Sequence, residues 1–177
     1  MIRMGLSDLP QVIIRKPVQT QEFKKPSTFN TNRVIQQLGR NPRAINTERL
    51  EEMKLKENFK GFDPRNISSA ELGVVGKTLL DLGLIDKLTA SLLSNVGVEF
   101  DRFGVPKNLD QKMDALEYYA AQITHLNGSS HKGMAYARHV IPEYEHAVHV
   151  LQNLYDFSEH GLVFYRNPKN LGMKATA

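Results

Sequence analysis

The chain has 177 residues and no cysteine, with 23 Lys and Arg against 19 Asp and Glu, for a formal net charge of +4. This length suits one domain with its own core, and the lack of thiols excludes disulfides, a thiolate nucleophile and a thiolate metal site. No stretch approaches the roughly 18–20 apolar residues of a membrane span. We therefore expect a cytoplasmic protein that does not bind membranes. The alternative is an organelle transit peptide, because residues 1–46 are basic and contain Ser and Thr.

The positive charge is concentrated at the N-terminus. Residues 1–66 hold 13 basic and 7 acidic residues, a net +6, whereas residues 67–177 hold 10 and 12, a net −2. In the first 30 residues, prolines follow Lys16 and Lys25 and favour extended backbone in polar surroundings. The sequence thus predicts a basic, partly disordered N-terminal arm over residues 1–66.

Two short helices are expected within this arm. The first starts at Thr31 or Asn32 and stops at Gly39, and the second starts at Asn46 or Thr47 and stops near residue 61. Helices of this length are not stable alone in water. They either pack on the core or fold on a partner.

Clearer helix boundaries begin at residue 67. The segment from Ser68 to Glu71 fits a capping box, so a helix should start there and end at Gly83, where a glycine C-cap is followed by leucine. A second helix is expected from about Asp86 to the region of Asn95. These two helices predict an αα-hairpin.

The second half of the chain predicts two longer helices. One follows the start signal Asn108 and Gln111 and closes at residues 127–128. The last starts after Ser129 or Ser130, runs to about Glu159, and has an apolar seam whose spacing predicts burial against another helix. A proline inside this helix predicts a kink. The seam comprises Met134, Ala137, Ile141, Tyr144, Val148, Leu151 and Tyr155.

Together these patterns predict an all-α fold, a small helical bundle of about four main helices over residues 67–165. It consists of the αα-hairpin and a pair of longer antiparallel helices, the last of them kinked at a proline. The basic arm precedes this core, and residues 166–177 form a flexible tail. The long seam also allows homo-oligomerisation through the last helix.

Glycines and a lysine at Gly73, Gly76 and Lys77 suggest phosphate binding at first sight. They lie inside a predicted helix rather than between a strand and a helix, where a phosphate loop belongs. We interpret the two glycines as small residues that let another helix approach closely.

The last helix also carries Glu143, His146 and His149, and a Glu-x-x-His pair is half of a di-iron carboxylate site. On a helical wheel His149 falls on the solvent face and His146 at its edge. No second Glu-x-x-His pair occurs in the other helices, so these three are weak metal candidates and no cofactor is predicted. Ser129, Ser130 and His131 lack a nucleophile elbow, and we predict no enzymatic activity.

The predicted function is therefore a non-enzymatic protein-protein interaction protein, an adaptor, chaperone-like or regulatory protein. Nucleic-acid binding through the basic residues 1–66 is the alternative, and a metal-binding helical bundle is the third possibility. The partner-binding candidates lie in the arm, where apolar and basic side chains could fold onto a partner. They are Phe23, Phe29, Arg33, Val34, Ile35, Leu38, Arg40, Arg43, Leu50 and Met53.

Overall fold

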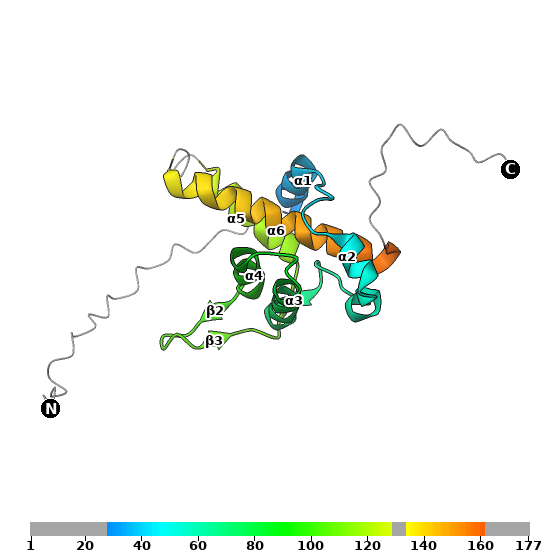
Figure 1. Cartoon of the computed structure of the whole chain (residues 1–177). Helices are drawn as coiled ribbons and strands as arrows, with labels where there is room; N and C mark the ends of the chain where they lie inside the picture. The colour runs from blue at the N-terminus through cyan, green and yellow to red at the C-terminus, as the bar shows by residue number, and fades with distance from the viewer. Residues whose placement is uncertain (1–27, 129–133, 162–177) are drawn as a thin grey trace, which may run out of the picture.

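The computed structural model describes residues 28–128 and 134–161. These residues are mostly helical (Figure 1), which confirms the predicted all-α class. The predicted disorder of residues 1–27, the caps at Ser129 and Ser130 and the tail from residue 166 lie outside the described residues. The helices are α1 (Thr28–Leu38), α2 (Thr47–Glu52), a 3-10 helix (Leu55–Phe59), α3 (Ser69–Asp81), α4 (Lys87–Ser94), α5 (Ala115–Leu126) and α6 (Ala135–His160).

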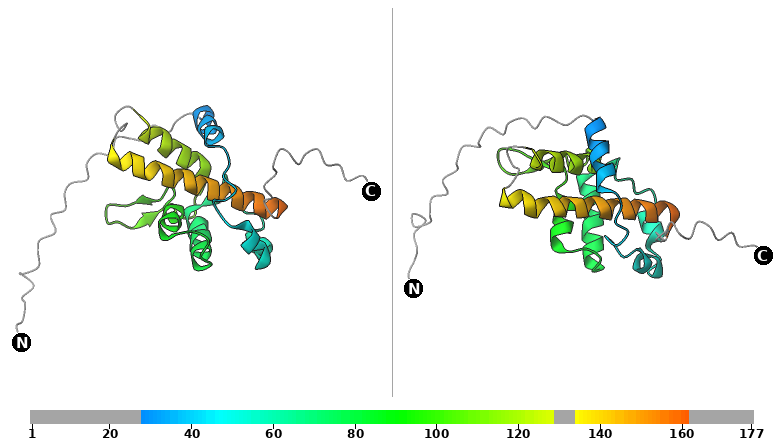
Figure 2. Two further views of the ribbon diagram at one scale, coloured as in Figure 1. Left: turned by 45° about the horizontal axis from the view of Figure 1, so that its top comes forward. Right: turned by 90° about the horizontal axis from the view of Figure 1, so that it is seen from above.

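The long helix α6 is the centre of the arrangement. It contacts α2, the 3-10 helix, α4 and α5, while α1 packs on α5 and α3 packs on α4. The views in Figure 2 show the chain reversing between α5 and α6, as predicted for an antiparallel pair.

Two short β-ladders were not predicted. Strand β1 (Ile67–Ser68) pairs antiparallel with β4 (Lys112–Met113), and β2 (Glu99–Phe100) pairs antiparallel with β3 (Pro106–Lys107). Two-residue strands are too short to show an alternating pattern in a sequence. The first ladder brings the two ends of the segment 67–113, which contains α3, α4 and the β2–β3 hairpin, together.

The αα-hairpin forms as predicted. Ser68 and Glu71 make the reciprocal capping box at the start of α3, and Gly83, with a φ of 68°, ends it. Asp86 caps α4 by accepting a hydrogen bond from the backbone N–H of Thr89. A Cβ added at Gly76 would lie 3.1 Å from the backbone oxygen of Ala90. The interpretation of Gly76 as a close-approach residue is therefore confirmed.

Helix α5 starts later than predicted. Its N-cap is Asp114, whose side chain accepts from the backbone N–H of Glu117. Asn108, which we expected near the helix start, instead adopts a positive φ of 48° and bonds to the backbone of the β2–β3 hairpin. Asn and Asp favour both caps and turns because their short side chains bond to nearby backbone, and here the turn prevails.

Helix α6 also differs in detail from its prediction. It begins at Ala135, after an N-cap residue that makes no side-chain cap, and it continues as one helix across Pro142 to Gly161. Of the predicted seam, Ala137, Val148 and Leu151 are buried. The terminal members Met134 and Tyr155 are exposed by 53% and 37%. The buried part of the seam is therefore shorter than expected.

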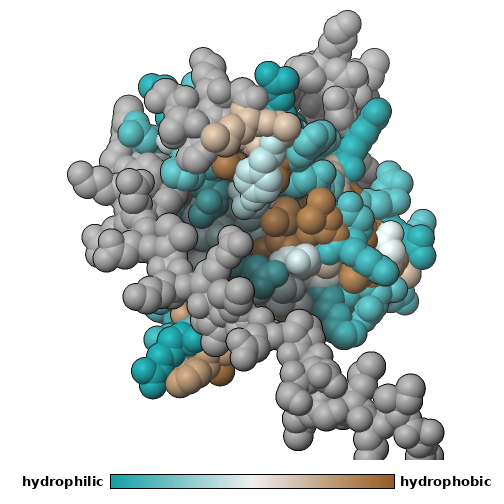
Figure 3. All heavy atoms as spheres, turned by 90° about the vertical axis from the view of Figure 1, so that its left-hand side faces the viewer, coloured by the Kyte–Doolittle hydropathy of each residue, from teal (hydrophilic) through white to brown (hydrophobic). Residues whose placement is uncertain are grey.

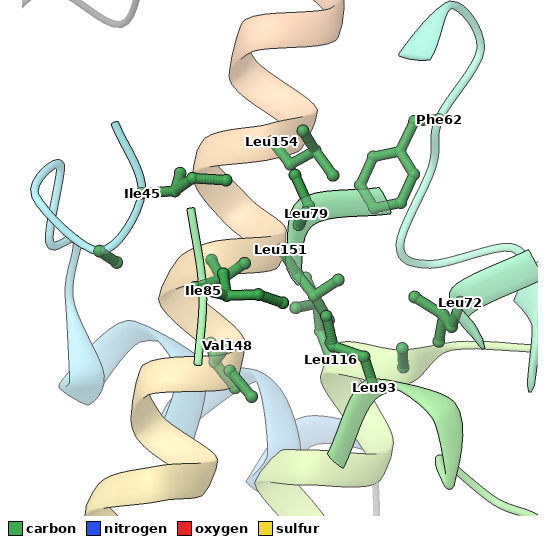
Figure 4. Close-up of a cluster of buried hydrophobic side chains, with 14 of the residues drawn as sticks. Ile45, Phe62, Leu72, Leu79, Ile85, Leu93, Leu116, Val148, Leu151 and Leu154 are labelled. Carbon is green, nitrogen blue, oxygen red and sulfur yellow. The ribbon is translucent and has the colours of Figure 1, made fainter. Parts of the chain in front are cut away.

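The core includes more of the N-terminal third than expected. Ile35, Leu50 and Phe59 belong to the same buried cluster as the side chains of α3 to α6. Figure 4 shows Ile45 and Phe62 directed toward Leu79, Leu116, Leu151 and Leu154. Residues 28–66 therefore pack as part of the bundle, and the division expected at residue 67 is not a boundary of the core. Helix α1 also starts at Thr28, three residues before the predicted position.

Candidate protein-docking surface

The β2–β3 hairpin projects from one end of the molecule (Figure 1), and three of its large apolar side chains are exposed to solvent. Phe100 is 57% exposed, Phe103 74% and Val105 56%. Scattered exposed apolar residues are ordinary, but a cluster on one short segment is a marker of an interaction site. We call these three residues the hairpin surface.

The backbone of the hairpin is held by local hydrogen bonds. Asp101 Oδ1 accepts from the backbone N–H groups of Phe103 at 2.8 Å and of Val105 at 2.9 Å. Asn108 clamps the base, because its Oδ1 accepts from Glu99 N and its Nδ2 donates to Gly97 O, both at 3.0 Å. These bonds hold the exposed aromatic side chains on a defined backbone before any partner arrives, which lowers the entropy cost of binding.

The charges on this hairpin balance. Glu99 and Asp101 are offset by Arg102 and Lys107, and the guanidinium carbon of Arg102 lies 4.5 Å from the centre of the Phe103 ring. This cation–π contact contributes about 0.5–1 kcal/mol at an exposed position. A segment with balanced charges is only weakly attracted to nucleic-acid phosphates, because that attraction requires an excess of positive side chains.

The start of α6 lies at the same end of the molecule as the hairpin (Figures 1 and 2) and adds two more exposed apolar residues. Met134 is 53% exposed and Tyr136 65%. Figure 3 shows this end of the molecule, with a brown apolar area surrounded by hydrophilic side chains. The hairpin surface and the start of α6 thus place five exposed apolar side chains at one end of the molecule.

The structure buries some of the predicted partner-binding residues and exposes others. Leu50 is fully buried and Ile35 is 8% exposed, so both contribute to the protein's own core. Val34 and Leu38 are partly buried against it. Exposed candidates are Arg33, Arg40, Arg43 and Met53; Phe23 and the side chain of Phe29 lie outside what the structure describes.

The metal candidates Glu143, His146 and His149 are all half-buried on α6. Within residues 28–128 and 134–161, no group of three or more His, Asp or Glu side chains is placed to hold a metal ion. The prediction that His149 lies on the solvent face was wrong, because its side chain is half-buried. Burial lowers the pKa of His149 below its ordinary value, and a side-chain hydrogen bond with Gln152 partly offsets this effect.

Three tyrosines pack together between α5 and α6. The ring of Tyr119 lies 5.6 Å from that of Tyr118 and 5.7 Å from that of Tyr144, measured between centroids. Burial is the main cause that raises the pKa of each hydroxyl, most strongly at the almost fully buried Tyr119. These side chains stay neutral near pH 7 and fill space between the helices.

Sequence reasoning missed the hairpin surface because it predicted no element between the helix end near Asn95 and the start signal at Asn108. One signal was present, since Phe100, Phe103 and Val105 supply three large apolar residues within six positions that also contain an Asp and a Gly. Such a mixture is unusual for a solvated loop and typical of a tight hairpin. The exposure of these side chains depends on which other segments pack nearby, and no local sequence pattern predicts that packing.

Comparison of the chain with models of protein families, with curated proteins and with solved structures finds no match. No helix among the described residues has both the length and the apolar character needed to cross a membrane.

Proposed function

We propose that this chain is a non-enzymatic protein-binding protein, an adaptor, chaperone-like or regulatory protein of the cytoplasm, and that it docks on its partner through the hairpin surface. The observation that carries the proposal is the exposure of Phe100, Phe103 and Val105 on a hydrogen-bonded hairpin. Aromatic anchors of this kind dominate the binding energy of protein interfaces.

The chemistry of the hairpin favours a protein with an apolar groove. Phe and Tyr side chains each bury about 150–250 Å² when fully covered, so Phe103 alone supplies a substantial anchor. The balanced charges of Glu99, Asp101, Arg102 and Lys107 suit a polar rim around such an anchor. Met134 and Tyr136 extend the apolar surface if the partner reaches the start of α6.

The test is site-specific photocrosslinking of the full-length protein. The photoreactive residue p-benzoylphenylalanine replaces Phe103 in one variant and Val74 in a control, because Val74 on α3 is similarly apolar and 68% exposed. The tagged proteins are irradiated in a nuclease-treated lysate of the native cell. We expect discrete protein adducts at position 103 and none of the same mass at position 74.

Competition decides whether these adducts are specific. Excess untagged wild-type protein should suppress them, whereas a Phe100→Ser/Val105→Ser double variant of unchanged thermal stability should not. Identical adducts at both positions, or equal suppression by both competitors, would refute docking through the hairpin. An adduct at the mass of two copies of this chain would identify self-association instead of an adaptor.

Nucleic-acid binding through residues 1–66 is the second candidate, favoured by the exposure of Arg33, Arg43 and Arg49. Because residues 28–66 supply part of the core, removing all of residues 1–66 would unfold the protein, and point variants are the better test. Replacing these three arginines with Gln should lower affinity for a labelled RNA or DNA and reduce its dependence on salt. Unchanged binding, or none by the wild type, would reject this candidate.

A further inference from the structure

The β2–β3 hairpin (Figure 1) has two outer edges, and their backbone groups differ. Phe100 on β2 lies opposite Pro106 on β3. Because proline has no backbone N–H, these two residues form a non-hydrogen-bonded pair. The ladder bond beside this pair runs from Asp101 N to Val105 O at 2.9 Å. In a non-hydrogen-bonded pair, the backbone N–H and C=O groups of both residues point outward, away from the opposite strand.

The edge of β2 therefore offers a donor and an acceptor at Phe100, whereas the edge of β3 offers the carbonyl of Pro106 without a donor. Natural sheets use proline in this way to protect an edge against further pairing. Neither backbone group of Phe100 bonds to another segment within the described chain, and both residues of β2 are exposed. Strand β2 is thus the edge that is open to another strand.

The side chains along β2 indicate the sequence of a strand that would fit. Successive residues point to opposite faces, so Glu99 and Asp101 lie on one face and Phe100 on the other. In the part of the chain that the structure describes, neither carboxylate forms an ion pair, although Lys107 lies across the ladder from Glu99. Opposite charges and apolar pairs are the favourable cross-strand neighbours. The complement of β2 is an apolar residue with Lys or Arg on each side.

A cleft of about 400 Å³ beside β2 fits one of these basic side chains, and Glu99 is part of its lining. The lysine and the aspartate that also line it, Lys112 and Asp114, are already held in ion pairs. The apolar lining includes Met113, Tyr118 and Ala121. The aliphatic part of a Lys or Arg side chain would lie on this apolar surface while its charged end reaches Glu99.

We propose that the partner protein adds an extended strand to β2, with an apolar residue opposite Phe100 and Lys or Arg opposite Glu99 and Asp101. This assignment depends on the proposed function, because the hairpin is the docking site in both. The backbone N–H and C=O of Phe100 would pair with the added strand, a known mode of peptide recognition. A second copy of β2 fits poorly, because antiparallel pairing centred on Phe100 places Glu99 opposite Asp101 of the other copy.

The probe is the acetylated and amidated peptide Thr-Lys-Val-Lys-Thr, which has the proposed pattern in either direction. It is titrated into isotope-labelled full-length protein, and the amide signals of residues 99–107 are followed by NMR. We expect saturable shifts at Phe100. Methylation of the three central peptide nitrogens removes strand hydrogen bonds but keeps side chains and charge, and should weaken binding about tenfold or more. Thr-Glu-Val-Glu-Thr should also bind more weakly.

Three results of this titration would overturn the proposal. They are the absence of shifts at Phe100, equal binding by the methylated peptide, and equal binding by the acidic peptide. Shifts at Phe100 that depend on protein concentration alone would identify a second copy as the occupant instead.

Two substitutions at one position separate backbone from side chain. Both Phe100→Ala and Phe100→Pro lose the aromatic ring, but only the proline variant loses the N–H, and proline is tolerated at an edge whose N–H faces solvent. We expect the peptide to bind Phe100→Pro about three- to tenfold more weakly than Phe100→Ala. Pro106→Ala, on the other edge, should leave the affinity measured at Phe100 unchanged. Equal binding by the alanine and proline variants contradicts the added strand; if the proline variant melts at a lower temperature, the methylated peptide decides.

Photocrosslinking at position 103 distinguishes failure of this proposal from failure of the proposed function. Adducts that are as strong with Phe100→Pro as with Phe100→Ala would retain docking through the hairpin surface and reject the added strand. The absence of specific adducts without either substitution would reject the proposed function itself.

Discussion

The α3–α4 hairpin and the β2–β3 hairpin follow one another in the chain and use their side chains in opposite ways. In the first, Leu79 and Leu93 are fully buried, and Gly76 lets the two helices touch. In the second, Phe100 and Phe103 are more than half exposed, and order comes from hydrogen bonds of Asp101 and the strand ladder. The same apolar residue types thus stabilise the fold in one hairpin and remain available for binding in the other.

The largest effect should come from truncating matched apolar residues in the two hairpins. Leu93→Ala leaves a cavity in the core and should lower the free energy of unfolding by about 2–5 kcal/mol. Phe103→Ala removes only exposed surface and a cation–π contact, and should cost less than about 1 kcal/mol. Urea denaturation followed by circular dichroism measures both. Similar losses would mean that the β2–β3 hairpin also contributes to the core.

A smaller contrast is expected between two glycines on α3. Alanine favours helix over glycine by about 0.5–1 kcal/mol, so Gly73→Ala should stabilise, since its Cβ would meet Ser94 at an ordinary 3.8 Å. At Gly76 the added Cβ would lie 3.1 Å from Ala90 O and 3.3 Å from Leu93 Cβ. Overpacking costs about 1–3 kcal/mol, so Gly76→Ala should destabilise. Stabilisation by both substitutions, seen as higher melting temperatures, would disprove the tight contact.

The clamp at the base of the β2–β3 hairpin should have a local effect. Asn108→Gly tolerates the positive φ of this position but loses the bonds to Glu99 N and Gly97 O. We expect faster amide hydrogen exchange in residues 99–107, with global stability changed by less than about 1–2 kcal/mol. Unchanged exchange in the hairpin would show that the ladder alone holds it.

The smallest effect concerns the contact between the start of α3 and β4, the strand that follows the β2–β3 hairpin. Lys112 on β4 donates to both carboxylate oxygens of Glu71 at the start of α3, and this contact is the main cause that lowers the Glu71 pKa below 4.5. Because the folded-state pKa is lowered, the stabilisation is present above the unfolded value and is lost as pH falls through the folded value. Lys112→Gln should raise the Glu71 pKa in an NMR titration. Lys77→Gln, which removes an ion pair to Asp81 instead, should leave it unchanged.

Sequence reasoning succeeded where a short-range pattern fixes the structure. The capping box at Ser68, the glycine ending at Gly83 and the cap at Asp86 each involve residues within four positions of one another. The close approach at Gly76 was also predicted, because a glycine inside a helix has few roles other than letting a neighbouring helix approach closely.

The failures in the core and in the ion pairs depend on contacts distant in sequence. Ile35 and Leu50 looked available to a partner, yet they are buried by α5 and α6 from the far end of the chain. Arg40 and Arg65 meet their carboxylate partners, Asp156 and Asp114, across large separations, 116 positions for Arg40 and Asp156. No local spacing predicts such pairs.

The bond from Asn153 to Asn41, across 112 positions, has a consequence for biosynthesis. Residues 28–62 leave the ribosome long before α6 exists to cover them. At about 5–20 residues per second, the ribosome needs roughly 5–20 s to make the intervening chain. During that time Ile35, Leu50 and Phe59 remain uncovered on a nascent chain, so early engagement by a chaperone should be greatest for this N-terminal third.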